Sequence, residues 1–361
     1  MFKPEIISSA DLKNILKNKK TALVCTKYWG KNNFLEKYLS INSSSFHQIV
    51  LIPSGEPESD SLDKISQGLD SGIEEIVALG GGSSIDSAKM LGILKNSNSR
   101  CADYEFAKKV IPNDVISIIA VPTTAGSGSE ATMYTVINNS QTRRKFTLTD
   151  YSLMPNRVLL CPELTMALPE KITISAGMDA FIQSFESFFS KKPNIISSSL
   201  APLVMSIILR NLPSIIQSPH DLQARKMMQE ASFLSGICIN YSRTGLIHTI
   251  SAALSKYFSN PHGELNTIIM PHVIEFNKEH HNPPKDQLEF LLKSLDLKSL
   301  DSFLDYIISF CRKFNLNIDT KVIVDKKEII KRIFQDSDLS SVNPQEIDEE
   351  KLLKLIERIL G

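Results

Sequence analysis

The first half of the chain alternates short apolar runs with helical patterns, and this alternation constrains the fold most strongly. Four apolar runs are expected to form buried strands, at residues 21–25, 47–52, 75–79 and 115–121. Buried strands separated by helices are typical of a parallel sheet that is covered on both faces. A further pair of strands at 132–137 and 144–148 predicts a hairpin, with Asn138-Asn-Ser-Gln141 as its turn.

The pattern changes near Pro169. Beyond this residue, apolar side chains recur mostly at intervals of three and four, as in Met178, Phe181, Ile182 and Phe185. This spacing indicates helices, and strand signals are nearly absent. We therefore predict an α/β domain with a parallel sheet at residues 1–170 and an all-α domain at residues 171–361.

The composition argues against several classes of partner. The chain has 40 basic and 40 acidic side chains, so no charge excess favours a nucleic acid or a membrane surface. The five cysteines show no Cys-x-x-Cys spacing, so neither a disulfide framework nor a thiolate metal site is indicated. The first residues lack a signal-peptide pattern, and no uncharged apolar run reaches membrane-spanning length. We expect a soluble, cytoplasmic protein.

A glycine-rich loop follows the strand expected at 75–79. Gly80, Gly81 and Gly82 allow close approach of the backbone to a ligand. Ser83 is expected to be the N-cap of the next helix, with Asp86 completing a start that resembles a capping box. Free N–H groups in such a first turn suit a pyrophosphate. Taken alone, the loop is equally compatible with a turn that binds no ligand, because the G-x-G-x-x-G spacing is absent.

A second polar loop follows the strand expected at 115–121. It reads Val121-Pro-Thr-Thr-Ala-Gly-Ser-Gly-Ser-Glu130 and is rich in hydroxyl groups and glycines. Ligands of open α/β sheets bind at the carboxyl ends of the strands. Two such loops at one edge of the sheet favour a nucleotide site.

A polar stripe marks the first helix of the second half. Asp179, Gln183 and Glu186 stand at i, i+4 and i+7 on an otherwise apolar helix, and buried polar groups need partners. With His248 and His262, a carboxylate and two imidazoles would suit Zn²⁺ or Fe²⁺. A single histidine is more often structural, and we interpret the others in this way: His47, His220, His272, His280 and His281.

Together these motifs resemble the iron-containing, or group III metal-dependent, alcohol dehydrogenases. The shared marks are Gly80-Gly-Gly-Ser-x-x-Asp86-x-x-Lys89, Pro122-Thr-Thr-Ala-Gly-x-Gly-Ser-Glu130, the Asp179 helix, and His248 with His262-Gly263 fourteen residues later. They occur in the family's order and span about residues 75 to 280. The resemblance implies a dehydroquinate synthase-like architecture, with a nucleotide-binding α/β domain and a helical metal-binding and substrate domain.

The resemblance also implies the ligands and the residues that hold them. The cofactors would be NAD(P)H and a divalent metal, Fe²⁺ or Zn²⁺. The residues that hold the dinucleotide would be Gly81, Gly82, Ser83, Thr123 and Thr124, with Asp86, Ser127 and Lys145 as neighbours. The metal ligands would be Asp179, His248 and His262.

Two positions depart from the family pattern. The family usually has a metal-binding histidine four residues after the aspartate, where this chain has Gln183. An amide oxygen is a poorer donor than imidazole, but three ligands and an open position still make a catalytic site, so we predict weakened but retained binding. The family also usually has a histidine four residues after the first histidine ligand. Here that position is Ala252, so the customary proton-relay residue is missing and no replacement is evident.

These departures resemble the phosphonoacetaldehyde reductase branch of the family. The segment 236–244 leads to His248 as in that branch, which also has a glutamine at the position of Gln183. Arg243 could clamp a phosphonate or carboxylate group of the substrate. Alternatively, Arg243 caps a helix or lies in solvent. Lys27, just after the first strand, favours NADPH without excluding NADH.

The expected activity is reversible hydride transfer between NAD(P)H and a small aldehyde or alcohol. One alternative is a synthase on the same scaffold, against which the 122–126 loop argues. Another is a degenerate family member that binds nucleotide without catalysis, which Gln183 and Ala252 favour. The resemblance further implies a homodimer or a larger assembly.

The metal hypothesis leads to a direct prediction. His262→Ala should abolish turnover, because it removes one of the expected metal ligands, and should leave nucleotide binding nearly intact. Steady-state rates and nucleotide titrations on the same preparation check both statements. Turnover that survives the substitution would show that the metal mechanism is wrong.

Overall fold

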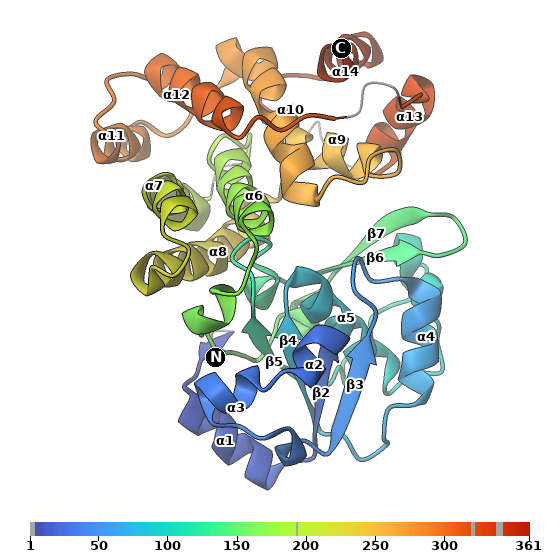
Figure 1. The fold of residues 1–361 in the computed structure, drawn as a ribbon. Helices are drawn as coiled ribbons and strands as arrows, with labels where there is room; N and C mark the ends of the chain where they lie inside the picture. The colour runs from blue at the N-terminus through green and yellow to red at the C-terminus, as the bar shows by residue number, and fades with distance from the viewer. Residues whose placement is uncertain (1–3, 193, 319–321, 337–341) are drawn as a thin grey trace. The chain divides into compact units, whose positions relative to one another are not determined.

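The computed structural model describes residues 4–192, 194–318, 322–336 and 342–361 (Figure 1). The chain divides into two units, Met1–Leu168 and Pro169–Gly361. This division lies two residues before the boundary that the sequence suggests.

A six-stranded parallel sheet forms the centre of the first unit, in the order β1-β8-β5-β4-β2-β3. The four strands predicted from apolar runs are present within two residues of the expected bounds, which confirms the α/β class. The sequence did not reveal β1 and β8, because strands of two residues carry no periodic pattern. The bounds are β1 (Glu5–Ile6), β2 (Thr21–Thr26), β3 (Gln48–Ile52), β4 (Glu75–Gly80), β5 (Ser117–Pro122) and β8 (Arg157–Val158).

Helices pack against both faces of this sheet, since alternate residues of a strand point to opposite sides. Leu23 and its neighbours in β4 and β5 form one core cluster with apolar residues of α1 and α3. On the other face, α5 packs against β4 and β5 and lies next to Ile118. The helices of this unit are α1 (Ser9–Asn18), α2 (Lys27–Lys31), α3 (Phe34–Leu39), α4 (Ser59–Gln67) and α5 (Gly82–Leu94). The 3₁₀ turns are η1 (Ser43–Ser45), η2 (Cys101–Ala107), η3 (Ser129–Ala131), η4 (Tyr151–Leu153) and η5 (Pro162–Thr165).

The predicted hairpin is present, but its turn lies two residues later than expected. Strands β6 (Tyr134–Asn139) and β7 (Arg144–Thr149) pair up to Asn139 opposite Arg144. Asn139 therefore ends a strand instead of standing in the turn. Its side-chain oxygen accepts hydrogen bonds from the backbone N–H groups of Gln141 and Thr142, at 3.0 and 3.2 Å. This side chain stabilises the turn from the strand, which sequence spacing alone does not show.

A buried lysine ties this hairpin to the helix that follows the glycine loop. Lys89 of α5 is fully buried, and its ammonium group donates to both oxygens of Thr132 and to the carbonyl of Tyr134, at 2.6–3.0 Å. Burial lowers the pKa of Lys89 to about 8, and the nearby carboxylates of Asp86 and Glu130 oppose that shift. The segment after the second loop is thus anchored to α5 by a satisfied buried charge.

The second unit is helical throughout its described residues, which confirms the all-α prediction. Helix α6 lies at its centre, packs against α7, α8 and α10, and is buried along most of its length. The helices are α6 (Glu170–Phe188), α7 (Ile195–Gln217), α8 (Leu222–Ser242), α9 (Leu246–Leu254), α10 (His262–Asn277), α11 (Lys285–Ser294), α12 (Leu300–Lys313), α13 (Lys326–Asp336) and α14 (Glu349–Leu360), with the 3₁₀ turn η6 (Lys278–His280).

Helix α7 is long and apolar enough to cross a membrane by length and composition alone. More than half of its apolar stretch is buried inside the structure, and it packs against α6 and α8. The same burial is found for core helices of soluble proteins, so the stretch is weak evidence for a membrane span.

The Lys89 contacts predict a loss of stability on substitution. Lys89→Met keeps the volume but leaves two buried carbonyls and two nearby carboxylates without the ammonium group. We expect the free energy of unfolding to fall by about 3–5 kcal/mol, measured by urea denaturation.

The matched control for this prediction is Lys64→Met on α4, where the lysine is exposed. We expect a change within about 0.5 kcal/mol for the control. Equal effects of the two substitutions would contradict a stabilising role for the buried ammonium group.

Candidate metal and nucleotide sites

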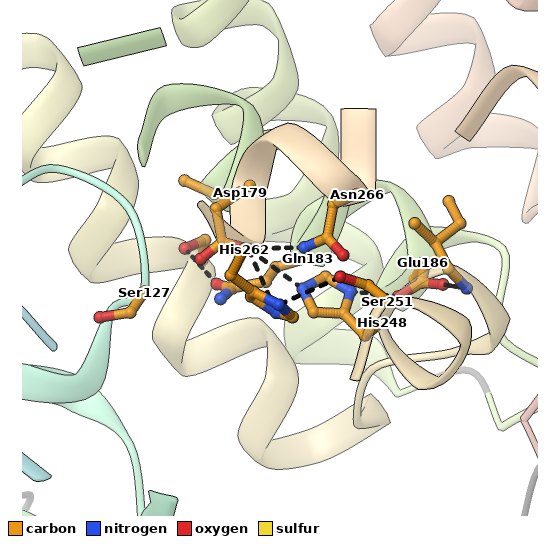
Figure 2. Close-up of polar contacts among 12 residues, drawn as sticks. Ser127, Asp179, Gln183, Glu186, His248, Ser251, His262 and Asn266 are labelled. Atoms are coloured by element: carbon orange, nitrogen blue, oxygen red, sulfur yellow. Dashed lines mark hydrogen bonds and ion pairs between the residues drawn. The ribbon is translucent and has the colours of Figure 1, made fainter. Parts of the chain in front are cut away.

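Three side chains of the second unit form a cluster of metal-ligand type (Figure 2). Asp179 comes from α6, His248 from α9 and His262 from the first position of α10. One potential ligand atom of each lies within 4.8 Å of the others. Asp179 Oδ1 is 3.3 Å from His248 Nε2 and 3.9 Å from His262 Nε2. The structure therefore brings together the three residues that the resemblance implied as ligands, over 83 positions of sequence (262 − 179).

Glu186 holds His248 and the start of helix α9 in place. Its buried carboxylate accepts hydrogen bonds from the backbone N–H groups of Gly245 and Ile247, at 2.8 and 2.6 Å, where α9 begins. It also contacts His248 Nδ1 at 2.6 Å. A ring held through Nδ1 presents Nε2 to Asp179, and carboxylate–histidine pairs of this kind commonly support metal ligands. The i+7 member of the predicted stripe thus supports a ligand instead of facing the cluster centre.

The two carboxylates make the cluster favourable for positive charge. Burial disfavours the charged form of His248, but Glu186 and Asp179 outweigh it and raise the pKa of the imidazole. For Asp179, burial is opposed by the hydrogen bond and charge of His248 and by His262, and the pKa of the carboxyl is lowered. The surroundings of His248 Nε2 therefore stabilise a cation.

His262 is held by a tight contact between two helices. The next residue, Gly263, lies so close to α6 that an added Cβ would be 1.9 Å from the backbone oxygen of Ser175. Glycine is therefore required where α10 starts against α6. His262 Nδ1 lies 3.1 Å from Ser251 Oγ, and its side chain is 36% exposed, against 10% for His248.

Asn266 was not identified from the sequence. It is fully buried one turn after His262, and its amide donates to Asp179 Oδ1 at 2.8 Å. Its spacing of four residues from His262 on α10 places both on one face of the helix, which is the signal that could have identified it.

The remaining predicted residues of this unit lie as follows. Gln183 is buried on α6, and its side-chain oxygen accepts a hydrogen bond from Ser235 at 3.0 Å, so its role as a weaker ligand stays a prediction. Ala252 is exposed on α9 and carries no group that could relay a proton. Arg243 is exposed at the C-cap of α8, with φ 59° and ψ 176°, a region that costs a non-glycine residue about 1–3 kcal/mol.

The donor set fits a divalent metal. One carboxylate and two imidazoles are ligands that Zn²⁺ and Fe²⁺ accept, and the three donors leave further coordination positions open. Each histidine has a partner at Nδ1, which leaves Nε2 as the donor directed at Asp179.

In the first unit, the glycine loop has the geometry of an anion site. Gly80 has φ +150°, and α5 begins directly at Gly82, with Gly81 as N-cap and no side chain capping its first turn. Our expectation that Ser83 is the N-cap was therefore wrong, since the glycines allow the helix to start two residues earlier. The uncapped N–H groups of this turn suit a phosphate.

Asp86 does not complete a capping box either. Its carboxylate accepts hydrogen bonds from Ser129 Oγ and from the backbone N–H of Val136. It therefore connects α5 to the second loop and to β6, a pairing distant in sequence that local spacing could not reveal.

The two polar loops meet at the carboxyl edge of the sheet. Gly80 pairs with Pro122 in the β4–β5 register, which aligns the loops that follow these strands. An added Cβ would lie 3.1 Å from Thr124 at Gly81 and 2.4 Å from Ser127 Oγ at Gly82. Both loops thus line one cradle that only glycine backbone leaves open.

Two other predicted nucleotide-binding residues, Thr123 and Lys145, already have partners within the protein. Thr123 is 2% exposed, and its backbone N–H donates to the carbonyl of Gly80 at 3.0 Å. Lys145 of β7 forms an ion pair with Glu56. Thr124, Ser127 and Ser83 are partly exposed at the loops.

A glycine-cradle α/β unit and a helical unit with an Asp-His-His cluster define a class of metal- and nucleotide-binding proteins. Residues 5–162 match the iron-containing alcohol dehydrogenase family, and residues 173–360 match the C-terminal domain of Fe-containing alcohol dehydrogenases. The chain belongs to the iron-containing alcohol dehydrogenase family.

Individual relatives agree with this assignment. The chain is 31% identical over 233 residues to the NAD-dependent methanol dehydrogenase of Bacillus methanolicus, covering 63% of this chain and 61% of that protein. Matches of this kind span about three fifths of the length of the curated relatives.

Solved structures share the whole fold. The sulfoacetaldehyde reductase from Bifidobacterium kashiwanohense in complex with NAD⁺ has a TM-score of 0.87 at 24% identity, covering 99% of this chain and 96% of that one. An iron-containing alcohol dehydrogenase from Thermotoga maritima has a TM-score of 0.82 at 25% identity, covering 100% and 99%.

The cradle predicts a selective effect of adding one methyl group. Gly82→Ala would force Ser127 away from the loop, so we expect nucleotide affinity to fall at least about tenfold and the free energy of unfolding by about 1–3 kcal/mol. Titration with NADPH, followed by its fluorescence, measures the affinity.

Gly68→Ala is the matched control, because an added Cβ at this exposed helix end meets nothing closer than 3.6 Å. Wild-type affinity in Gly82→Ala would contradict the placement of the nucleotide phosphates at this loop.

Proposed function

We propose that this protein is a metal-dependent alcohol dehydrogenase that acts as an aldehyde reductase, transferring hydride reversibly between NAD(P)H and a small aldehyde. The observation that carries the proposal is the Asp179–His248–His262 cluster, in which both imidazoles are supported at Nδ1. The glycine cradle at the ends of β4 and β5 and the named activities of the relatives support it.

Asp179, His248 and His262 would hold the metal, with Gln183 as a weaker fourth ligand. When bound, the metal would supply Lewis acidity toward a carbonyl oxygen, and the nicotinamide would supply the hydride. Glu186 keeps His248 oriented and stabilises positive charge at the cluster. The binding position is thus pre-organised before any ligand arrives.

The loops of the first unit would hold the nucleotide. Gly81, Gly82 and Ser83 would present N–H groups of the α5 turn to the pyrophosphate, with Thr124 and Ser127 beside them. Asp86 would act by shaping the second loop through Ser129, and Thr123 through its backbone bond to Gly80. Lys145, paired with Glu56, would be a peripheral neighbour of the same ligand.

The proton that the alkoxide needs would come from solvent. Ala252 is exposed and has no titratable group, so α9 offers no relay at the usual position. This absence also favours the second candidate, a family member that binds nucleotide without catalysis.

The preferred substrate in this proposal is phosphonoacetaldehyde, and NADPH the preferred cofactor. Arg243 is exposed and makes no hydrogen bond or ion pair through its side chain with the described residues, so its guanidinium is free to bind an anion. It stands two residues before Gly245, which bonds to Glu186. Lys27 is exposed at the carboxyl end of β2, where it would attract a 2′-phosphate.

The test is oxidation of NADPH and NADH, followed by absorbance, with neutral aldehydes and phosphonoacetaldehyde and with Fe²⁺, Zn²⁺ or chelator. We expect metal-dependent turnover. Arg243→Gln should raise KM for phosphonoacetaldehyde about tenfold or more, because a charged hydrogen bond contributes about 1.5–3 kcal/mol.

Neutral aldehydes are the internal control and should react equally with both proteins. Equal KM values for phosphonoacetaldehyde would refute the role of Arg243. Nucleotide binding without turnover under any metal condition would favour the second candidate.

A further inference from the structure

The two histidines of the cluster differ in how they are held. His248 contacts carboxylates through both ring nitrogens, Glu186 at 2.6 Å and Asp179 at 3.3 Å. His262 Nε2 is 3.9 Å from Asp179, beyond hydrogen-bond distance, and more than a third of its side chain is exposed. His262 has a further contact at its other ring nitrogen, Nδ1.

That contact is the hydroxyl of Ser251. Ser251 is fully buried on α9, and its Oγ lies 3.1 Å from His262 Nδ1 (Figure 2). It stands three residues after His248, on the same face of the helix. One helix thus carries one ligand and the support of another.

The contact at Nδ1 agrees with metal binding through Nε2. A neutral ring carries one proton, so a ring that binds a metal through Nε2 must carry its proton on Nδ1. The Ser251 hydroxyl can accept this N–H, so the contact is compatible with metal binding through Nε2. It also limits rotation of the ring without adding a third negative charge to Asp179 and Glu186.

We propose that Ser251 is a positioning residue, which holds the His262 ring in the orientation that binds the metal. This inference rests on the metal-dependent function proposed above and extends it to a residue outside the ligand set. It assigns the support of the more exposed ligand to a neutral group on α9.

The test measures metal binding instead of turnover. Ser251→Ala removes one buried oxygen atom, and its Zn²⁺ affinity is determined by competition with a chromophoric chelator. We expect affinity to fall about 10–100-fold, as for other outer-shell partners of metal-binding histidines. The Co²⁺ absorption spectrum of the variant should change as well, and Ser251→Thr, which keeps the hydroxyl, should restore the affinity.

Ser232→Ala is the matched control. Ser232 is also fully buried in the helical unit, but its hydroxyl makes no hydrogen bond with the residues that the structure describes. Its substitution should leave the Zn²⁺ affinity and the Co²⁺ spectrum unchanged. Circular dichroism and ¹⁵N NMR of the histidine rings report separately on folding and on the tautomer of His262.

The outcomes separate this inference from the proposed function. Wild-type affinity and spectrum in Ser251→Ala overturn the inference, and so does an equal loss in Ser232→Ala. A wild-type protein that binds metal and shows the Ser251 effect but reduces no aldehyde overturns the proposed function alone. A wild-type protein that binds neither Zn²⁺ nor Co²⁺ overturns both.

Discussion

The buried carboxylate of Glu186 is the interaction on which the rest of the candidate metal site depends. It accepts the N–H groups of Gly245 and Ile247 that open helix α9, and it contacts His248 on the same helix. Backbone donors at a helix start have no partner within the helix, so this side chain from α6 satisfies them. The Glu186 carboxylate therefore fixes the start of α9 and the direction of the His248 ring. It also favours positive charge near Asp179. Its loss would leave these buried donors unpaired, so the side chain is needed at this depth.

In the first unit, the candidate nucleotide site depends on the pairing of two neighbouring strands. Parallel pairing of β4 with β5 places Gly80 beside Pro122, so both polar loops leave the same edge of the sheet. Lys89 and Asp86 of α5 then connect the helix to the segment after the second loop. Buried polar contacts of α5 therefore anchor the segment that follows the cradle. The cradle itself is left open because Gly81 and Gly82 carry no side chains.

Much of this organisation could be predicted from residue patterns. The apolar runs marked four of the six strands, and the change in period after Pro169 marked the helical half. The i, i+4, i+7 stripe correctly predicted a buried polar face on α6, although it did not show which members face the cluster. The stripe pointed to Asp179, and the resemblance then implied Asp179, His248 and His262 as ligands, two of the seven histidines of the chain among them.

The sequence by itself determined which residue types are available for chemistry. It also determined the apolar period of each segment, because that period depends only on residues a few positions apart. Only the tertiary structure decided the hydrogen-bond partners. Glu186 pairs with a helix 59 residues away, Ser129 with Asp86 over 43 residues, and Asn266 with Asp179 over 87 residues. Such pairs are set by how helices and strands pack, and packing depends on the whole buried surface instead of on local spacing. The supports of the candidate site therefore became visible only once the chain was folded.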